Sequence, residues 1–213
     1  MVTSFDHLRL HPAVLRFFRL HFRFLSDGHI QFRYLGESGE DEQEIFSLTC
    51  RCVPCTSALW IACPVYAQAV KHCFLFNSAA EAISFSHYCT RHISGSQDKA
   101  FVSLGLLPRE EQVERIRNMY PNAKLHTVFG SDLPGRVMDC KIALWSKRRD
   151  ARFTYDREYI QVAIEGRLHP IPAQEFSLNR FERTTGLRAG IRTHKSKNSF
   201  SSFLEMLINN ASA

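Results

Sequence analysis

Apolar and polar residues follow a repeated order in the middle of the chain, in which a short apolar run precedes a stretch with helical spacing. The apolar runs are typical of buried strands, and we predict strands at Lys71–Asn77, Ala100–Leu107 and Lys124–Phe129. The stretches after them predict helices at Ser78–His92, Pro108–Tyr120 and Val137–Trp145. Three strand–loop–helix units in succession predict an α/β fold with a parallel sheet flanked by helices.

The third unit carries the loop that draws most attention, Gly130–Arg136, which is rich in small and turn-forming residues. A strand that ends in such a loop and leads into a helix places polar groups at the carboxyl edge of a sheet. Open α/β sheets have their binding sites at this edge. We therefore expect the candidate site to lie there.

The chain before the core is aromatic and basic. Residues from Pro12 fit a short amphipathic helix, and the alternation from Leu20 fits a strand. We expect Phe17 and Phe18 to pack on the sheet rather than on a membrane surface. A β-hairpin is predicted next, with strands at His29–Leu35 and Glu44–Cys50. The acidic turn between them is Gly36–Gln43.

The chain after the core is predicted to be a basic strand, loop and helix extension. We predict a strand at Tyr159–Ile164, a turn at Glu165–Arg167 and an extended segment at Leu168–Pro172. Residues 179–198 are predicted to be a flexible loop because they contain glycines and several serines and threonines. A closing helix at Ser202–Asn209 is expected to dock through Phe203, Leu204 and Leu207. These predictions divide the chain into residues 1–69, 70–146 and 147–213.

Composition is that of a folded protein, because 45% of the 213 residues are hydrophobic and 12% are aromatic. We find no apolar run of about 18 residues, so no membrane partner is expected. The N-terminus lacks the order of a signal peptide, and seven cysteines do not resemble a secreted disulfide framework. A reduced, cytoplasmic location is expected.

The net charge of +6 is carried by the last third of the chain. Residues 1–140 hold fourteen Lys and Arg against fourteen Asp and Glu, whereas residues 141–213 hold thirteen against seven. Such a basic part points to an anionic partner, of which nucleic acid is the natural candidate. The expected phosphate-binding residues are Arg136, Lys147, Arg148, Arg149, Arg180, Arg183, Arg188, Arg192, Lys195 and Lys197. A solvated basic linker is the alternative.

Three stretches resemble a known family. They read FLFNSAAEAISF, VSLGLL and VFGSDLPGR, and they look like the signature strands of a Toprim domain, the fold of bacterial primases and topoisomerases. The chain is most similar to the primase-like Toprim proteins of Bacteroidetes mobile elements, over residues 28–145. The resemblance implies a Toprim-like sheet and a nucleic-acid-binding accessory role in the replication or transfer of a mobile element.

The chain departs from that family at its catalytic positions. The family's glutamate falls on Asn77 and its first aspartate on Gly130, while the second aspartate is kept as Asp132. Mg²⁺ needs carboxylate oxygens while it bridges phosphate, so we expect a degenerate site without a tight metal or other cofactor. Two readings remain open. Glu81 and Asp139 could complete a displaced site in an active Mg-dependent primase- or nuclease-like enzyme, or the fold could be a protein-interaction module that binds no nucleic acid.

Cysteine and histidine residues give no strong metal motif. Cys52 and Cys55 have the spacing of a zinc knuckle, with Cys50 and Cys63 nearby, but a second pair of that spacing is missing. Free thiols are the simpler expectation, and zinc is left open. Ser78 and Glu81 have the spacing of a capping box, which accounts for both residues at the start of their helix.

Overall fold

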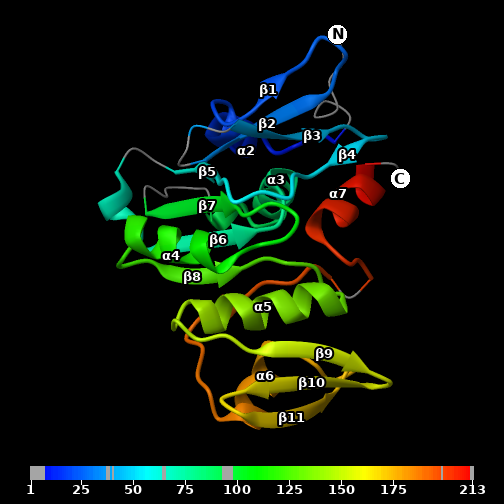
Figure 1. Cartoon of the computed structure of the whole chain (residues 1–213). Coiled ribbons are helices and arrows are strands. Elements are labelled where there is room, and N and C mark those ends of the chain that lie inside the picture. Colours follow the sequence, from blue (N-terminus) through cyan, green and yellow to red (C-terminus); the bar gives the residue numbers. More distant parts are fainter. Residues whose placement is uncertain are drawn as a thin grey trace.

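A computed structural model describes residues 8–36, 39, 41–63, 66–92, 98–197 and 199–211. Its centre is a five-stranded sheet in the order β12-β8-β6-β7-β5 (Figure 1). The strands are β5 (Trp60–Ala62), β6 (His72–Phe76), β7 (Lys99–Ser103), β8 (Lys124–Thr127) and β12 (Arg192–Thr193). Neighbours among β12, β8, β6 and β7 run parallel, and only β5 at the edge is antiparallel. The predicted α/β class is confirmed.

Helices cover both faces of this sheet, because its central strands are apolar on both sides. On β6, Phe74 and Phe76 join the core under α3 (Ala79–Tyr88) and α7 (Phe203–Ala211). Cys73 and Leu75 point the other way, toward α4 (Glu110–Met119) and α5 (Leu133–Trp145). The predicted closing helix is confirmed as α7, which docks through buried Phe203, Leu204, Met206 and Leu207.

A second, antiparallel sheet lies against the first core. It has the order β1-β2-β3-β4, with β1 (Arg23–Phe24), β2 (Ile30–Leu35), β3 (Asp41–Phe46) and β4 (Arg51–Cys52). The predicted hairpin is confirmed as β2 and β3. Its second strand runs from Asp41 to Phe46 and not from Glu44 to Cys50, because the ladder extends into the acidic stretch, where Leu35 lies opposite Asp41. An ion pair between Arg33 and Asp41 stabilises this end. Glu37, Ser38 and Glu40 of the predicted turn lie outside the described residues.

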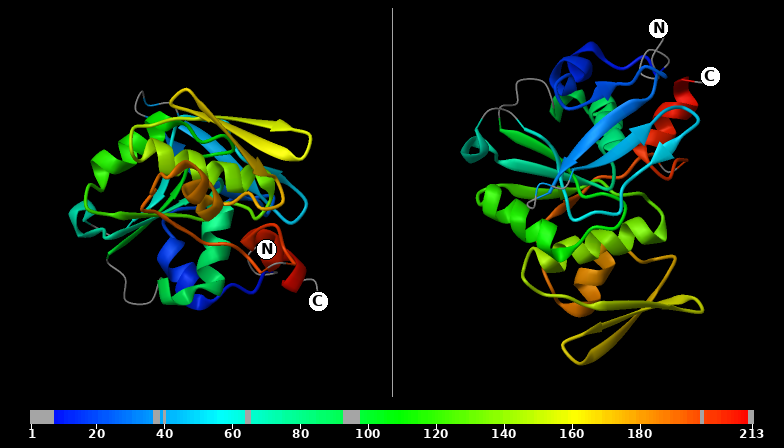
Figure 2. Two further views of the ribbon diagram at one scale, coloured as in Figure 1. Left: turned by 90° about the horizontal axis from the view of Figure 1, so that it is seen from below. Right: turned by 45° about the horizontal axis from the view of Figure 1, so that its top comes forward.

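The predicted helix from Pro12 is confirmed as α2 (Pro12–Phe18). Figure 2, seen from below, shows α2, α3 and α7 side by side on one face of the central sheet. Phe18 is fully buried against Trp60 and Phe101, and Phe17 contacts the ring of Phe101. The expectation that these aromatic residues pack on the sheet is therefore confirmed. Within the described ranges, no helix has the length and apolar character that a membrane span needs.

The C-terminal part adds a third sheet beneath α5 (Figure 1). It contains β9 (Arg152–Asp156), β10 (Tyr159–Ile164) and β11 (Arg167–Pro172), and α6 (Leu178–Thr185) packs on it. The predicted strand at 159–164 and the turn after it are confirmed, with Glu165 and Gly166 at positive φ. Strand β9 was not predicted.

The prediction of a flexible loop over residues 179–198 is wrong. Ser177 caps α6, Leu178 and Phe181 are buried under it, and Gly186 ends it in the left-handed conformation. Residues 192–193 then pair with β8 as the edge strand β12. Burial of Leu178 and Phe181 on one face stabilises this helix, although its remaining residues are polar.

Two helix boundaries also differ from the prediction. The helix expected at 137–145 begins at Leu133, because Asp132 caps it and Pro134 suits a first turn. The helix expected to reach His92 ends at Tyr88 and is followed by a separate 3-10 turn, η2 (Thr90–His92). A second such turn, η1 (Ala67–Ala69), precedes β6.

Candidate functional site

The carboxyl ends of β6 and β8 open into one cavity of about 370 Å³. Asn77 follows β6, and Gly130 and Asp132 follow β8, its parallel neighbour. All three line the cavity, as do Arg51 and Glu81. Asn77 and Asp132 therefore lie together at the carboxyl edge, where the candidate site was expected.

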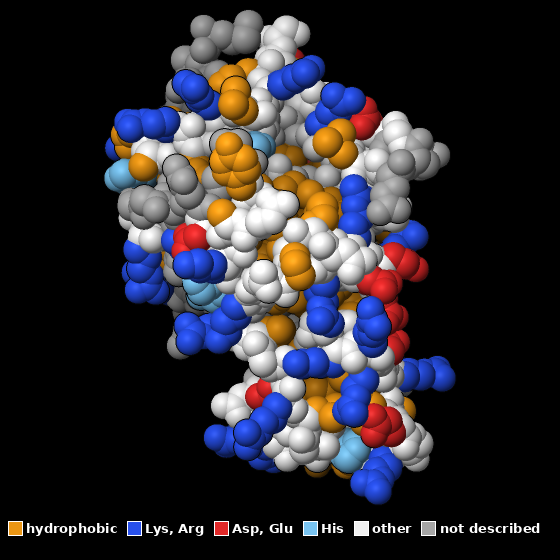
Figure 3. Space-filling model, turned by 90° about the vertical axis from the view of Figure 1, so that its left-hand side faces the viewer, with side chains coloured by type: hydrophobic (Ala, Val, Ile, Leu, Met, Phe, Trp, Pro, Cys, Tyr) orange, Lys and Arg blue, Asp and Glu red, His pale blue; other side chains and the backbone are white. Residues whose placement is uncertain are grey.

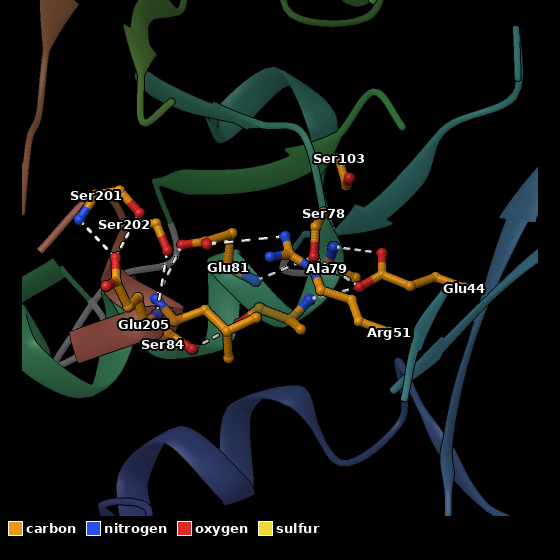
Figure 4. Close-up of polar contacts among 12 residues, drawn as sticks. Glu44, Arg51, Ser78, Ala79, Glu81, Ser84, Ser103, Ser201, Ser202 and Glu205 are labelled. Atoms are coloured by element: carbon orange, nitrogen blue, oxygen red, sulfur yellow. Dashed lines mark hydrogen bonds and ion pairs between the residues drawn. The ribbon is translucent and has the colours of Figure 1, made fainter. Parts of the chain in front are cut away.

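The N-terminus of α3, which begins at this edge, is occupied by a carboxylate of the chain itself. Glu44 is fully buried, and it accepts hydrogen bonds from the amides of Ala79 (2.8 Å) and Ala80 (3.1 Å) and the hydroxyl of Ser78 (2.7 Å) (Figure 4). The hydroxyl of Tyr34 donates a fourth bond at 2.6 Å. Free amides and the helix dipole make such a terminus an anion site, and Glu44 fills it.

Sequence reasoning missed Glu44, although a signal was present. In β3 the side chains of Glu44 and Phe46 both point inward, so the glutamate stands in phase with an apolar residue of the same strand. A charged residue at an inward position of a strand needs buried partners, since burial without them is costly. The N-terminus of α3 supplies those partners.

The N-terminus of α7 is occupied in the same way by Glu81. Its carboxylate accepts a hydrogen bond from the amide of Leu204 at 3.1 Å and lies 3.8 Å from the guanidinium of Arg51 (Figure 4). The predicted capping box is therefore only half right. The Ser78 hydroxyl accepts from the Glu81 amide at 3.4 Å, but the Glu81 carboxylate caps a helix 123 residues away.

Burial raises the pKa of the Glu81 carboxyl, and the neighbouring Glu44 raises it further. A hydrogen bond from Ser202, the charge of Arg51 and the amide of Leu204 act in the opposite direction and are outweighed. A carboxyl with a raised pKa in a cavity is the kind of group that serves acid–base chemistry. Here the carboxylate also accepts the hydrogen bond from the Leu204 amide, so a structural role accounts for the presence of Glu81.

The loop after β8 is held by close contacts. Asp132 caps α5 by accepting a hydrogen bond from the Gly135 amide at 3.0 Å. A Cβ at Gly135 would overlap the carbonyl oxygen of Gly130, and a Cβ at Gly130 would lie 2.7 Å from the carboxylate of Asp132. The amide of Ser131 donates to the carbonyl of Ser201 at 2.8 Å, so the segment before α7 crosses this edge. Asp132 and both glycines thus have structural roles.

An internal cation stands behind the same loop. The ammonium of Lys195 lies 2.6 Å from the carboxylate of Asp139 and donates to the carbonyls of Phe129 (3.1 Å) and Gly130 (2.8 Å). Burial raises the pKa of the Asp139 carboxyl, although Lys195 and the hydroxyl of Thr127 lower it. Lys195 is therefore committed to the fold, which removes it from the set of residues free to bind phosphate.

The carboxyl edge offers Mg²⁺ a poorer set of ligands than a group of free carboxylates would. Asn77 offers an amide, Gly130 offers no side chain, and Asp132 is engaged as a cap. Asp139 is paired with Lys195, whose positive charge opposes a second cation nearby. Among the residues that the structure describes, no group of three or more His, Cys, Asp or Glu could hold a metal.

The four cysteines for which zinc was left open are not gathered into such a group either. Cys50, Cys52 and Cys55 are exposed, and Cys63 is half-buried. Burial raises the pKa of the Cys63 thiol, while a hydrogen bond with Tyr120 lowers it.

Several predicted phosphate-binding residues have partners within the protein. Arg136 donates to the carbonyls of Gln174 and Phe176 and so connects α5 to the segment before α6. Arg148, Arg149 and Arg180 lie 4.0, 3.5 and 3.3 Å from carboxylates, in the pairs Arg148–Glu114, Arg149–Glu165 and Arg180–Glu175. These pairs are solvent-exposed, and such pairs are weak. Arg183, Arg192 and Lys197 are exposed.

Three of the predicted cations meet around a second pocket, on the side opposite the carboxyl edge. Lys147, Arg149 and Arg188 line a hollow of about 510 Å³ whose floor is apolar. It lies where α5 ends, between that helix and the segment after α6. Figure 3 shows Lys and Arg side chains spread over the lower half of this side, with apolar side chains among them. We call this hollow the basic pocket.

A chain of three histidines crosses the central sheet, which the sequence did not indicate. His126 of β8 is hydrogen-bonded to His72 of β6 at 2.9 Å and to His194, which follows β12, at 3.0 Å. Burial lowers the pKa of His194, and the charges of Arg91 and Arg192 lower it further. The rings bond to one another in a row, so they do not converge on a common ligand position.

Comparisons with protein-family models, with curated proteins and with solved structures find no match to this chain.

Proposed function

We propose that this protein binds nucleic acid through the basic surface around the basic pocket, and that its carboxyl edge carries out no phosphate chemistry. The observation that carries the proposal is the convergence of Lys147, Arg149 and Arg188 on one hollow. Within the described residues, Lys147 and Arg188 have no ion-pair partner, and both are exposed. Their charges are available to phosphates.

The cations in and beside the pocket come from two segments of the chain. Lys147, Arg148 and Arg149 occupy the turn after α5, and Arg188 projects from the segment after α6. Phosphates of a nucleic acid backbone carry evenly spaced negative charge, and each contact with a cation releases condensed counterions. A surface of this kind binds with strong salt dependence and little dependence on sequence.

The internal contacts of the acidic residues at the carboxyl edge support the second half of the proposal. The N-termini of α3, α5 and α7 are capped by Glu44, Asp132 and Glu81, which would repel a phosphate at the usual position. The ammonium of Lys195 is held behind the loop after β8 by its ion pair with Asp139. This arrangement stabilises the fold and engages Glu44, Glu81 and Asp132 in contacts within the protein.

The resemblance to Toprim domains belongs to the same proposal. A Toprim-like sheet with a degenerate edge and a separate basic surface would act as an accessory factor in the replication or transfer of a mobile element. Asn77 and Gly130 support the degenerate reading, since neither can supply a carboxylate. The resemblance itself rests on the three sequence motifs.

The test measures the affinity for labelled oligonucleotides at several salt concentrations, with fluorescence anisotropy as the readout of each titration. Replacing Lys147 and Arg188 together by alanine should lower the slope of log affinity against log salt by about one to two, because each phosphate contact contributes roughly 0.9 on duplex DNA and 0.7 on single strands. Arg16→Ala with Arg19→Ala removes the same charge from exposed positions on and after α2, and should leave the slope unchanged. Equal slopes for both double variants would refute the proposed surface.

Incubation of the protein with the same oligonucleotides and Mg²⁺ tests whether the carboxyl edge is inactive. The strands should be recovered intact, and titration calorimetry should detect no micromolar Mg²⁺ site. Cleavage or primer synthesis that Glu81→Gln abolishes would instead establish an active enzyme with a displaced metal site. If no oligonucleotide binds at any salt concentration, the protein-interaction module becomes the better reading.

A further inference from the structure

The basic pocket differs from a flat phosphate-binding surface because it is hollow and its floor is apolar. Ala143, Leu144 and Phe181 are almost fully buried beneath it, and half-buried Leu187 forms one wall. A backbone phosphate needs only the rim cations and gains nothing from an apolar floor. The floor therefore calls for a second, apolar part of the same ligand.

The wall of the pocket is held in place before any ligand arrives. Gly186 and Gly190, both at positive φ, bracket the segment that carries Leu187 and Arg188. The carboxylate of Glu182 accepts a hydrogen bond from the amide of Ala189 at 2.6 Å, which fixes this segment against α6. A site whose wall is already ordered loses less conformational entropy when it binds.

We infer that the basic pocket accepts one unstacked base of a single-stranded nucleic acid while the rim cations hold the adjoining phosphates, an inference that rests on the proposed function. Its volume of about 510 Å³ lies within the range of small-ligand sites. Guanidinium groups such as those of Arg149 and Arg188 can stack on a base as well as bind phosphate. The apolar floor accepts a base without reading its edges, so binding tolerates any sequence.

Single strands are favoured over duplexes for a physical reason. A base in a duplex is stacked and paired, and its extrusion into a pocket has a cost of a few kcal/mol. A single strand presents its bases with little of that cost. The basic rim can still contact a duplex through phosphates alone, so duplex binding should persist with lower affinity.

The experiment compares a single strand, a duplex and a single strand of abasic sites, all of one length, on the wild-type protein. The single strand should bind about tenfold more tightly than the other two, which corresponds to about 1.4 kcal/mol. Leu187→Asn, which changes neither charge nor size greatly, should lower single-strand affinity to that of the abasic strand without changing the salt slope. Leu168→Asn, at an exposed leucine of β11, is the matched control and should bind as wild type.

The outcomes separate the two levels of the proposal. Equal affinity for the ordinary and the abasic strand on wild-type protein would overturn the base pocket and leave the proposed function standing. Failure to bind any of the three would overturn the proposed function itself. Competition by polyglutamate as effective as that of the single strand would also overturn the inference, because the pocket would then recognise only negative charge.

Discussion

Lys195 provides a sharp test of which basic residues are structural. The sequence predicts that both Lys195 and Arg188 bind phosphate, whereas in the structure Lys195 is paired with Asp139 and Arg188 is exposed. Lys195→Met removes an ammonium that lies 2.6 Å from the Asp139 carboxylate, whose side chain is 2% exposed. It also leaves the carbonyls of Phe129 and Gly130 without this donor. Breaking a buried pair on one side costs roughly 3–5 kcal/mol.

The side chain of Lys195 is 28% exposed, so the lower end of that range applies, and we expect a loss of about 3 kcal/mol. In a chain of this size such a loss lowers the melting temperature by about 6–12 °C. The assay is thermal and urea unfolding followed by circular dichroism. The double variant with Asp139→Asn should recover at least half of the loss, since it removes the unpaired buried charge. Lys197→Met, at an exposed cation two residues away, is the control.

The same variant should leave nucleic-acid binding unchanged. Folded Lys195→Met protein should bind the single strand with wild-type affinity and salt slope. The double alanine variant of Lys147 and Arg188 should instead have a lower salt slope and an unchanged free energy of unfolding. If Lys195→Met unfolds within about 0.5 kcal/mol of wild type, as a surface substitution does, the ion pair with Asp139 is not what holds this edge together.

Two further predictions concern the carboxyl edge. Gly135→Ala should lower the free energy of unfolding by about 1–3 kcal/mol, since its Cβ would meet the Gly130 carbonyl oxygen, and an unchanged urea midpoint would contradict this packing. Glu81→Gln should change the pH profile of stability: the raised pKa lets the folded protein keep a proton that the unfolded chain releases near 4.5, so wild-type stability falls as pH rises above that value. The variant lacks this proton, so its unfolding free energy should fall less than that of wild type between about pH 4.5 and 7, whereas Glu111→Gln, at an exposed site, should follow the wild-type curve.

The sequence by itself determined the local elements of the core. Apolar runs followed by helical spacing were enough to predict β6, β7, β8 and the helices after them, because short-range patterning sets these elements and a strand buried on both faces has few polar residues. The same reasoning predicted α7 and the strand β10. It also brought Asn77 and Asp132 to one edge, since parallel neighbours end on the same side of a sheet.

Only the tertiary structure decided what the polar residues do. Glu44 caps α3 and Glu81 caps α7 across 35 and 123 residues, and no local spacing encodes such a partner. Helix α6 and strand β12 were predicted as loop because most of their residues are polar. Only Leu178 and Phe181 of α6 are buried, which is too few to give a clear helical pattern. Lys195 and Arg188 look alike in the sequence, yet one is held by a buried carboxylate and the other is exposed, because the path of the chain after α6 brings only Lys195 to Asp139.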